Sequence, residues 1–241
     1  MPERFVTLRH RKEKPTKKEW RMNKIINGLL SFAMVTMAAM GVVSCRNSKP
    51  ATGDADCYGI DLSHHNTVTD WDKVTAKFVY LKATEGATHR DSKFDSFVTN
   101  AKKRGILVGA YHFYVTTSTI ESQFQNFCEA VDKYEMDLIP VLDLERGSPK
   151  TSAEVRADVR TFVNLCKKHF GVAPILYCSQ PYYMKNLRGN FSDCMYWCGD
   201  VDAPAVLPHV LHQKCIKAVP GVKGRVDYNV LDGELGDICL P

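Results

Sequence analysis

Eight short apolar runs recur along the chain from Tyr58 onward, and they constrain the fold more than any other feature. Several are continuously apolar rather than alternating, which is the pattern of strands buried on both faces of a parallel sheet. We therefore predict eight strands. The runs cover residues 58–62, 78–82, 106–113, 138–145, 175–178, 195–198, 210–213 and 224–229.

Three amphipathic helical patterns lie between the earlier runs, and no comparable pattern follows Gly171. Two of them open with a Ser or Thr followed three residues later by Glu, the arrangement of an N-terminal capping box. The patterns are 91–104, a segment starting at Ser118 with Glu121, and a segment from Thr151 to Gly171 with Glu154 as its capping partner.

Strands that alternate with helices predict a parallel sheet joined by crossovers, and eight strands suggest that the sheet closes into a barrel. Residues 57–241 are fewer than the roughly 250 of a complete eightfold barrel, and the helical patterns become sparse after residue 171. We therefore predict an α/β fold, a single irregular TIM-like (β/α) barrel domain with about eight strands and reduced helices.

The first 45 residues have the character of a targeting segment. An apolar run over 25–43 follows basic residues and ends at Ser44-Cys45, the pattern of a secretory signal. The cysteine after a small residue resembles a bacterial lipobox, in which Cys45 is lipidated. We predict a leader over 1–45, starting at Met1 or Met22, and a polar tether over 46–56. An uncleaved membrane anchor is the alternative, and both readings export the domain.

The net charge of +5 belongs to the leader. Residues 1–24 hold nine Lys or Arg and three Glu, so the rest of the chain is close to neutral. A nucleic-acid-binding domain needs a basic surface. We therefore predict no nucleic-acid partner, and we expect the domain to be a monomer.

Four acids fall at predicted strand ends. Asp143 and Glu145 close the run over 138–145, and residues two apart on a strand face the same way. Asp61 ends the first run and Asp227 lies on the last, and these strands are neighbours in a closed barrel. Barrel enzymes keep their sites at this end. A pair of carboxylates is what glycosidic cleavage requires, although acids also cap strand ends in contact with water.

Aromatic side chains cluster at the same strand ends: Tyr111, Phe113, Tyr114, Tyr177 and Trp197. Aromatic platforms beside acids suit a saccharide groove, and rim aromatics that fill the barrel interior are the plainer explanation. His64, His65, His112 and His212 match no zinc motif, so we predict no metal and no cofactor, and take the histidines as cleft or structural residues.

Eight cysteines remain when Cys45 is set aside, and export permits disulfides among them. Cys57 and Cys239 lie near the two ends of the domain and are our first choice of pair. The alternative is that some of these cysteines are buried thiols that pack as small apolar side chains. The eight are Cys57, Cys128, Cys166, Cys178, Cys194, Cys198, Cys215 and Cys239.

Six motifs occur in the order and spacing of glycoside hydrolase family 25, the Chalaropsis-type lysozymes, which are N-acetylmuramidases. The resemblance runs from about Tyr58 to Leu231. The motifs are Tyr-Gly-Ile-Asp-Leu-Ser (58–63), Thr-Asp-Trp-Asp-Lys-Val (69–74), Phe-Val-Tyr-Leu-Lys-Ala-Thr-Glu-Gly (78–86), Gly-Ala-Tyr-His-Phe (109–113), Val-Leu-Asp-Leu-Glu (141–145) and Val-Asp-Tyr-Asn (226–229).

The resemblance implies a flattened barrel with few helices and assigns roles to site residues. Glu145 would be the general acid, with Asp143, Asp61 and Asp227 around the scissile bond. The predicted substrate-binding residues are Tyr111, Lys82, Tyr177, Trp197, Phe113, His112 and Gln213.

These observations predict a lysozyme-type glycoside hydrolase that cleaves the β-1,4 bond between N-acetylmuramic acid and N-acetylglucosamine. Its partners would be peptidoglycan glycan strands and, through the lipid on Cys45, a membrane of the bacterial cell envelope. Two alternatives stay open at this point. One is an endo-glycosidase acting on another N-acetylated glycan such as chitin, and the other is a non-catalytic glycan-binding lipoprotein.

Overall fold

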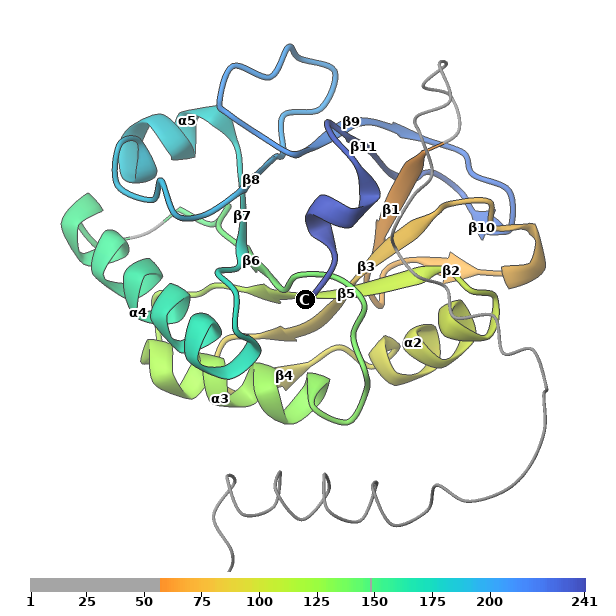
Figure 1. Cartoon of the computed structure of the whole chain (residues 1–241), viewed down its shortest axis with the longest axis horizontal. Helices are drawn as coiled ribbons and strands as arrows, with labels where there is room; N and C mark the ends of the chain where they lie inside the picture. The colour runs from red at the N-terminus through yellow and green to blue at the C-terminus, as the bar shows by residue number, and fades with distance from the viewer. Residues whose placement is uncertain (1–56, 148) are drawn as a thin grey trace, which may run out of the picture. The chain divides into compact units, whose positions relative to one another are not determined.

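The computed structural model describes residues 57–147 and 149–241, which form a closed barrel (Figure 1). The predicted leader, Cys45 and the tether over 46–56 lie outside the described residues. Within the described part of the chain, no helix is both long enough and apolar enough to cross a membrane.

Eight strands form the wall of the barrel, and each falls within or overlaps one of the predicted runs. β1 pairs with both β3 and β11, and this double pairing closes the sheet. All neighbours are parallel except β11, which is antiparallel to β1 and β9. In order around the barrel the strands are β1 (Tyr58–Leu62), β3 (Phe78–Glu85), β5 (Leu107–Phe113), β6 (Val141–Asp143), β7 (Ile175–Cys178), β8 (Tyr196–Cys198), β9 (Leu211–Lys217) and β11 (Val226–Leu231).

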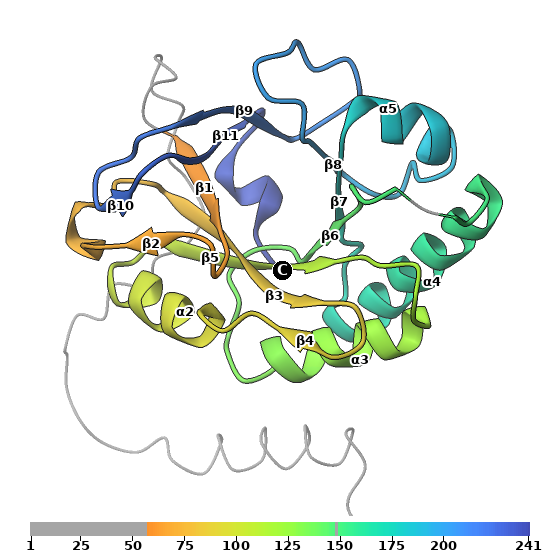
Figure 2. The ribbon, with the colours of Figure 1, turned by 180° about the vertical axis from the view of Figure 1, so that it is seen from behind.

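The predicted irregular barrel with reduced helices is thus confirmed. The main helices pack around one part of the wall (Figures 1 and 2), and after the third of them only short helical turns occur. The helical segments are η1 (Trp71–Lys73), α2 (Phe94–Lys103), α3 (Ile120–Val131), α4 (Ser152–Phe170), α5 (Gln180–Tyr182), η2 (Tyr183–Leu187) and η3 (Leu235–Ile238); the short strands β2 (Thr67–Val68), β4 (His89–Arg90) and β10 (Val222–Lys223) lie outside the barrel wall.

Local boundaries differ from the predictions at two places. The capping box of α4 forms between Thr151 and Glu154 as predicted. The box predicted at Ser118 is wrong by one residue, because Thr119 takes the extended N-cap conformation and accepts a hydrogen bond from the backbone N–H of Ser122. The strand predicted over 138–145 is shorter, because its first part bonds to the C-terminal segment: the N–H of Ile139 donates to the carbonyl of Ile238.

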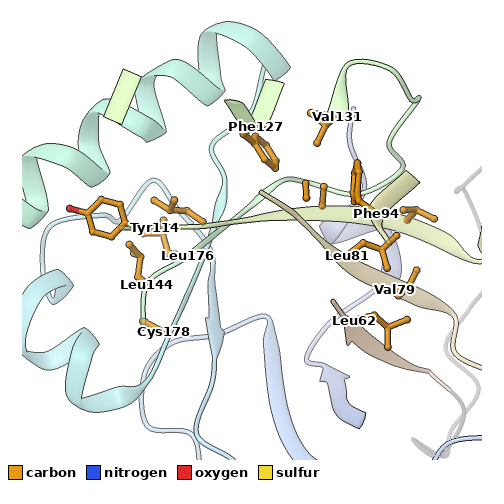
Figure 3. Packing of buried hydrophobic residues seen from close by; sticks show 14 of the residues in the cluster. Leu62, Val79, Leu81, Phe94, Tyr114, Phe127, Val131, Leu144, Leu176 and Cys178 are labelled. Atoms are coloured by element: carbon orange, nitrogen blue, oxygen red, sulfur yellow. The ribbon is translucent and has the colours of Figure 1, made fainter. Parts of the chain in front are cut away.

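The apolar side chains form two layers that follow from the alternation along each strand. Val79 and Leu81 point outward and pack under the helices, in the cluster shown in Figure 3. Phe78 and Tyr80 alternate with them and fill the barrel interior, where the Tyr80 ring lies 5.1 Å from that of Trp197. This alternation decides which side chains at the strand ends face the interior.

The C-terminal segment closes the amino-terminal end of the barrel. Ile238 on η3 is fully buried among the interior side chains, and Leu138 forms an isolated bridge with Cys239. In Figure 1 this helical turn lies within the ring of strands. The interior is therefore open only toward the carboxyl ends of the parallel strands.

Candidate active site

A cavity of about 430 Å³ opens at the carboxyl ends of the strands, and all four predicted acids line it. Asp61 and Asp227 lie directly opposite each other on the antiparallel pair β1 and β11. Asp143 is the last residue of β6, and Glu145 follows two residues later. Four carboxylates from three strands therefore meet in one pocket.

The pocket alters the ionisation of Asp61. Burial, and after it the neighbouring charge of Asp227, raises the pKa of the Asp61 carboxyl to about 7. Asn229 opposes this effect by donating from Nδ2 to Asp61 Oδ2 at 2.8 Å. Burial also raises the pKa of Asp227. At neutral pH this pair therefore holds on to a proton that isolated carboxyls would release.

Asp143 and Glu145 differ in their exposure. Asp143 is buried, and burial together with the charges of Glu145 and Asp61 raises its pKa well above the usual value. Its Oδ1 atom has no hydrogen-bond partner among the described residues. Glu145 is exposed at the mouth, and its pKa is raised by partial desolvation and lowered by the charge of Lys82. The pocket thus contains an accessible acid beside a buried acceptor.

The groove side chains line the same cavity. Tyr111, Phe113, Tyr177, Trp197 and Gln213 all contribute to its wall. Tyr177 donates its hydroxyl proton to Gln213 Oε1 at 2.7 Å, and its ring meets that of Trp197 edge-on at 5.3 Å. The Nε1 donor of Trp197 is buried and has no partner among the described residues. These side chains present both apolar faces and unused polar atoms to a ligand.

His112 is the one predicted groove residue that the structure places outside the pocket. Because it lies between Tyr111 and Phe113, which face inward, its side chain points outward. There it is fully buried, 2.7 Å from Thr84 Oγ1 and 3.1 Å from Gln123 Oε1. Burial lowers its pKa to about 4. His112 is therefore a neutral structural histidine in the outer layer, and the groove assignment is corrected.

Further pocket residues were not among the predicted site residues. They are Ser63, His65, Glu85, Val141 and Arg146. Glu85 bonds to Lys82, with Oε2 accepting from Nζ at 2.7 Å, and its Oε1 lies 3.2 Å from Arg146 Nη1. Glu85 belongs to the motif over 78–86, but strict alternation of side chains along the strand, counted from inward-facing Lys82, predicts that Glu85 faces outward. A bulge in β3 reverses that assignment.

No cysteine among the described residues lines the cavity, and three of them are buried. Cys166, Cys178 and Cys198 are buried, and burial raises the pKa of each thiol. Such thiols carry little thiolate and are inert. No group of three or more His, Cys, Asp or Glu among residues 57–147 and 149–241 is arranged to hold a metal ion.

Asp61→Asn is expected to stabilise the domain at neutral pH. The folded-state pKa of Asp61, about 7, lies above the ordinary 3.8. Between those values the folded chain binds more protons than the unfolded chain, so the free energy of unfolding falls as pH rises. Asparagine does not ionise, so the variant should keep the free energy of unfolding that the wild type loses between these pH values, on the order of a few kcal/mol at pH 7. Urea unfolding across pH 4 to about 7.5 measures it.

The control is Asp232→Asn, which changes an exposed aspartate outside this pocket. It should leave the pH dependence of unfolding as in the wild type. If the curve of Asp61→Asn runs parallel to the wild-type curve, the proton held in the pocket does not belong to Asp61.

A closed barrel with a carboxylate pair and aromatic walls at the carboxyl ends of its strands defines a glycoside hydrolase site. The chain belongs to the glycosyl hydrolases family 25, whose family model matches residues 60–210. The resemblance that the sequence motifs indicated is thereby confirmed.

Individual relatives agree with this assignment. A family 25 glycosyl hydrolase structure from Bacillus anthracis is 26% identical, with a TM-score of 0.70 over 80% of this chain and 97% of that one. The bacterial lysozyme structure from Streptomyces coelicolor is 25% identical, with a TM-score of 0.70 over 77% and 96%. An N,O-diacetylmuramidase of Arthroderma benhamiae is 28% identical over 173 residues, which are 67% of this chain and 73% of that protein.

Proposed function

We propose that this protein is a muramidase that hydrolyses the β-1,4 bond between N-acetylmuramic acid and N-acetylglucosamine in peptidoglycan. The observation that carries the proposal is the pairing of exposed Glu145, whose pKa is raised, with buried Asp143 in an aromatic-walled cavity. A raised pKa keeps a carboxyl protonated so that it can act as an acid. The relatives named lysozyme and muramidase support the same substrate.

The chemistry follows from where the acids lie. Glu145 donates its proton to the glycosidic oxygen as the bond breaks. Asp143 sits close by on the same strand end, so it approaches the sugar from the same side as Glu145. A nucleophile must approach opposite the leaving group. We therefore assign the attack to the oxygen of the substrate's own acetamido group, with Asp143 orienting and polarising that group. Asp61 or Asp227 acting as a base is the rival, and would invert the anomeric centre.

Cleavage of purified peptidoglycan compared with chitin oligomers tests the substrate. We expect new reducing ends at muramic acid from peptidoglycan, identified by mass spectrometry, and slow or no release from chitin. Cleavage of chitin with peptidoglycan left intact would assign the enzyme to the second glycan. Binding of peptidoglycan without release of any product would make the protein a glycan-binding lipoprotein.

The cellular setting is also a proposal. A peptidoglycan hydrolase acts outside the cytoplasm, and the lipobox-like Ser44-Cys45 supports a lipoprotein of the cell envelope. Cys45→Ala should move the protein from the membrane fraction to the soluble fraction, and the mature wild-type N-terminus should be acylated Cys45 by mass spectrometry. An unmodified N-terminus upstream of residue 25 would indicate a transmembrane anchor instead.

The disulfide between Cys57 and Cys239 stays a prediction. In the chain-entropy account a link across so long a loop stabilises by about 4–5 kcal/mol. Thiol titration of unfolded, unreduced protein measures it, and eight reactive thiols in the mature domain would contradict it.

A further inference from the structure

A β-bulge places two charged residues of β3 on the same inner face. In the pairing of β3 with β5, Lys82 lies opposite Tyr111 and Thr84 lies opposite His112, so one extra residue is inserted between them. The next pair is Glu85 with Phe113, and both line the cavity. Strict alternation would have turned Glu85 outward. Bulges of this kind re-aim side chains beside active sites.

Glu85 uses this position to hold two cations together. Its carboxylate lies 2.7 Å from Lys82 Nζ and 3.2 Å from Arg146 Nη1. Both cations also lie over the ring of Phe113, at 4.7 Å for Lys82 and 4.9 Å for Arg146. We call these four side chains the Arg146 corner. The contacts fix the guanidinium beside the cavity instead of leaving it to sample solvent.

The Arg146 corner carries a net positive charge within an otherwise acidic pocket. Two permanent cations share one carboxylate, whereas Asp61 on the adjacent strand β1 and Asp227 on β11 form no ion pair with a lysine or arginine of the described residues. The Lys82 side chain is only 10% exposed, but that of Arg146 is 58% exposed. A guanidinium has five N–H donors, and its contact with Glu85 leaves donors available to a ligand. An exposed, oriented guanidinium suits a carboxylate.

We infer that the Arg146 corner binds a carboxylate carried by muramic acid, which makes Arg146 a specificity-determining residue for muramic-acid glycans over chitin. This deepens the proposed muramidase function and rests on it. N-acetylmuramic acid differs from N-acetylglucosamine by a 3-O-lactyl group that ends in a carboxyl. Because Arg146 directly follows Glu145, their Cα atoms are about 3.8 Å apart. Both side chains also line the same cavity, so the bound carboxylate belongs to the sugar at the scissile bond or to a substituent on it.

Two sources present this carboxylate. In peptide-free strands it is the lactyl group itself, and in intact strands, where the lactyl carboxyl is amide-linked, it is an acidic residue of the stem peptide. Peptide-free strands are compared with the same strands after conversion of the lactyl carboxylate to the methylamide. Peptide-bearing strands are compared before and after amidation of their carboxylates. Each pair differs only in the charge under test.

The measurement is the ratio of kcat/KM for the charged strand to that for its neutral form. For the wild type we expect a preference of about tenfold in one pair, the size of a charge-assisted hydrogen bond. Arg146→Gln should reduce that ratio to about one, and Arg146→Lys should retain part of it. The control is Arg104→Gln, because Arg104 is also half-exposed and paired with an aspartate, Asp72, outside the pocket. It should keep the wild-type ratio.

The possible results distinguish failure of the Arg146 inference from failure of the muramidase proposal. A preference in the first pair assigns the lactyl carboxylate, and one in the second pair assigns the peptide. No preference in either pair, or a preference that survives in Arg146→Gln, overturns the inference. If the wild type cleaves no strand, the muramidase proposal fails. Calorimetric binding of the same four strands then decides the inference, which requires about tenfold weaker binding of the charged strand by Arg146→Gln.

Discussion

Glu145→Gln is expected to lower kcat on peptidoglycan by about 10²–10⁴-fold, the usual contribution of general acid catalysis. Glutamine preserves the shape of the side chain but has no proton to give to the leaving oxygen. Glu145 is exposed at the mouth and forms no hydrogen bond or ion pair among residues 57–147 and 149–241, so the variant should unfold at or above the wild-type temperature. Release of reducing ends and a thermal melt followed by circular dichroism measure the two quantities.

The matched control is Glu121→Gln, an exposed glutamate in the first turn of α3 and outside the pocket. It should keep wild-type turnover. Near-wild-type cleavage by Glu145→Gln would remove Glu145 from the role of acid and leave Asp61, whose pKa of about 7 also keeps it protonated, as the candidate.

Loss of the substrate's acetyl group should have a similarly large effect. Strands whose muramic acid amine is unacetylated lack the acetamido oxygen that we assign as the nucleophile. We expect them to be cleaved about 10²–10³-fold more slowly, the loss that follows removal of one group that stabilises the transition state. Acetylated strands should give the retained anomer first, as followed by NMR.

The variant Asp143→Asn tests whether Asp143 acts through the substrate's acetamido group. On acetylated strands the variant should lose about 10²–10³-fold in kcat, because we propose that Asp143, whose Oδ1 has no hydrogen-bond partner among the described residues, orients the acetamide. On unacetylated strands it should lose little more, since two changes that remove one interaction are not additive. Undiminished cleavage of unacetylated strands, or initial release of the inverted anomer, would favour Asp61 or Asp227 as a base.

The acids were predictable from sequence because each follows a strong local rule. Asp143 ends an apolar run, and the period of two along a strand separates it from outward-facing Leu144. The same rule, applied to Tyr111, would have turned His112 away from the pocket. Its inclusion among the groove residues came from the family motif, which is contiguous in sequence and takes no account of which face each residue occupies.

Glu85 and Arg146 were not predictable in this way. The bulge that turns Glu85 inward depends on how β3 pairs with β5, and no residue type in the segment predicts it. Arg146 lies beyond the end of β6, where strand periodicity no longer applies, and its contacts with Glu85 and with the Phe113 ring fix its place. The strand at 138–145 was predicted too long for a related reason, because Ile139 pairs with Ile238, about a hundred residues away in sequence.

The closure of the barrel by β1 and β11 brings together acids from the two ends of the domain's sequence. β1 is among the first parts of the domain to be synthesised and β11 is among the last, yet Asp61 faces Asp227 only after they pair. A nascent chain that has already made Asp143 and Glu145 still has an open sheet and an incomplete ring of acids. A chain cut short before Asp227 would stay in that condition. The four acids therefore line one pocket only in a chain whose first and last barrel strands have paired.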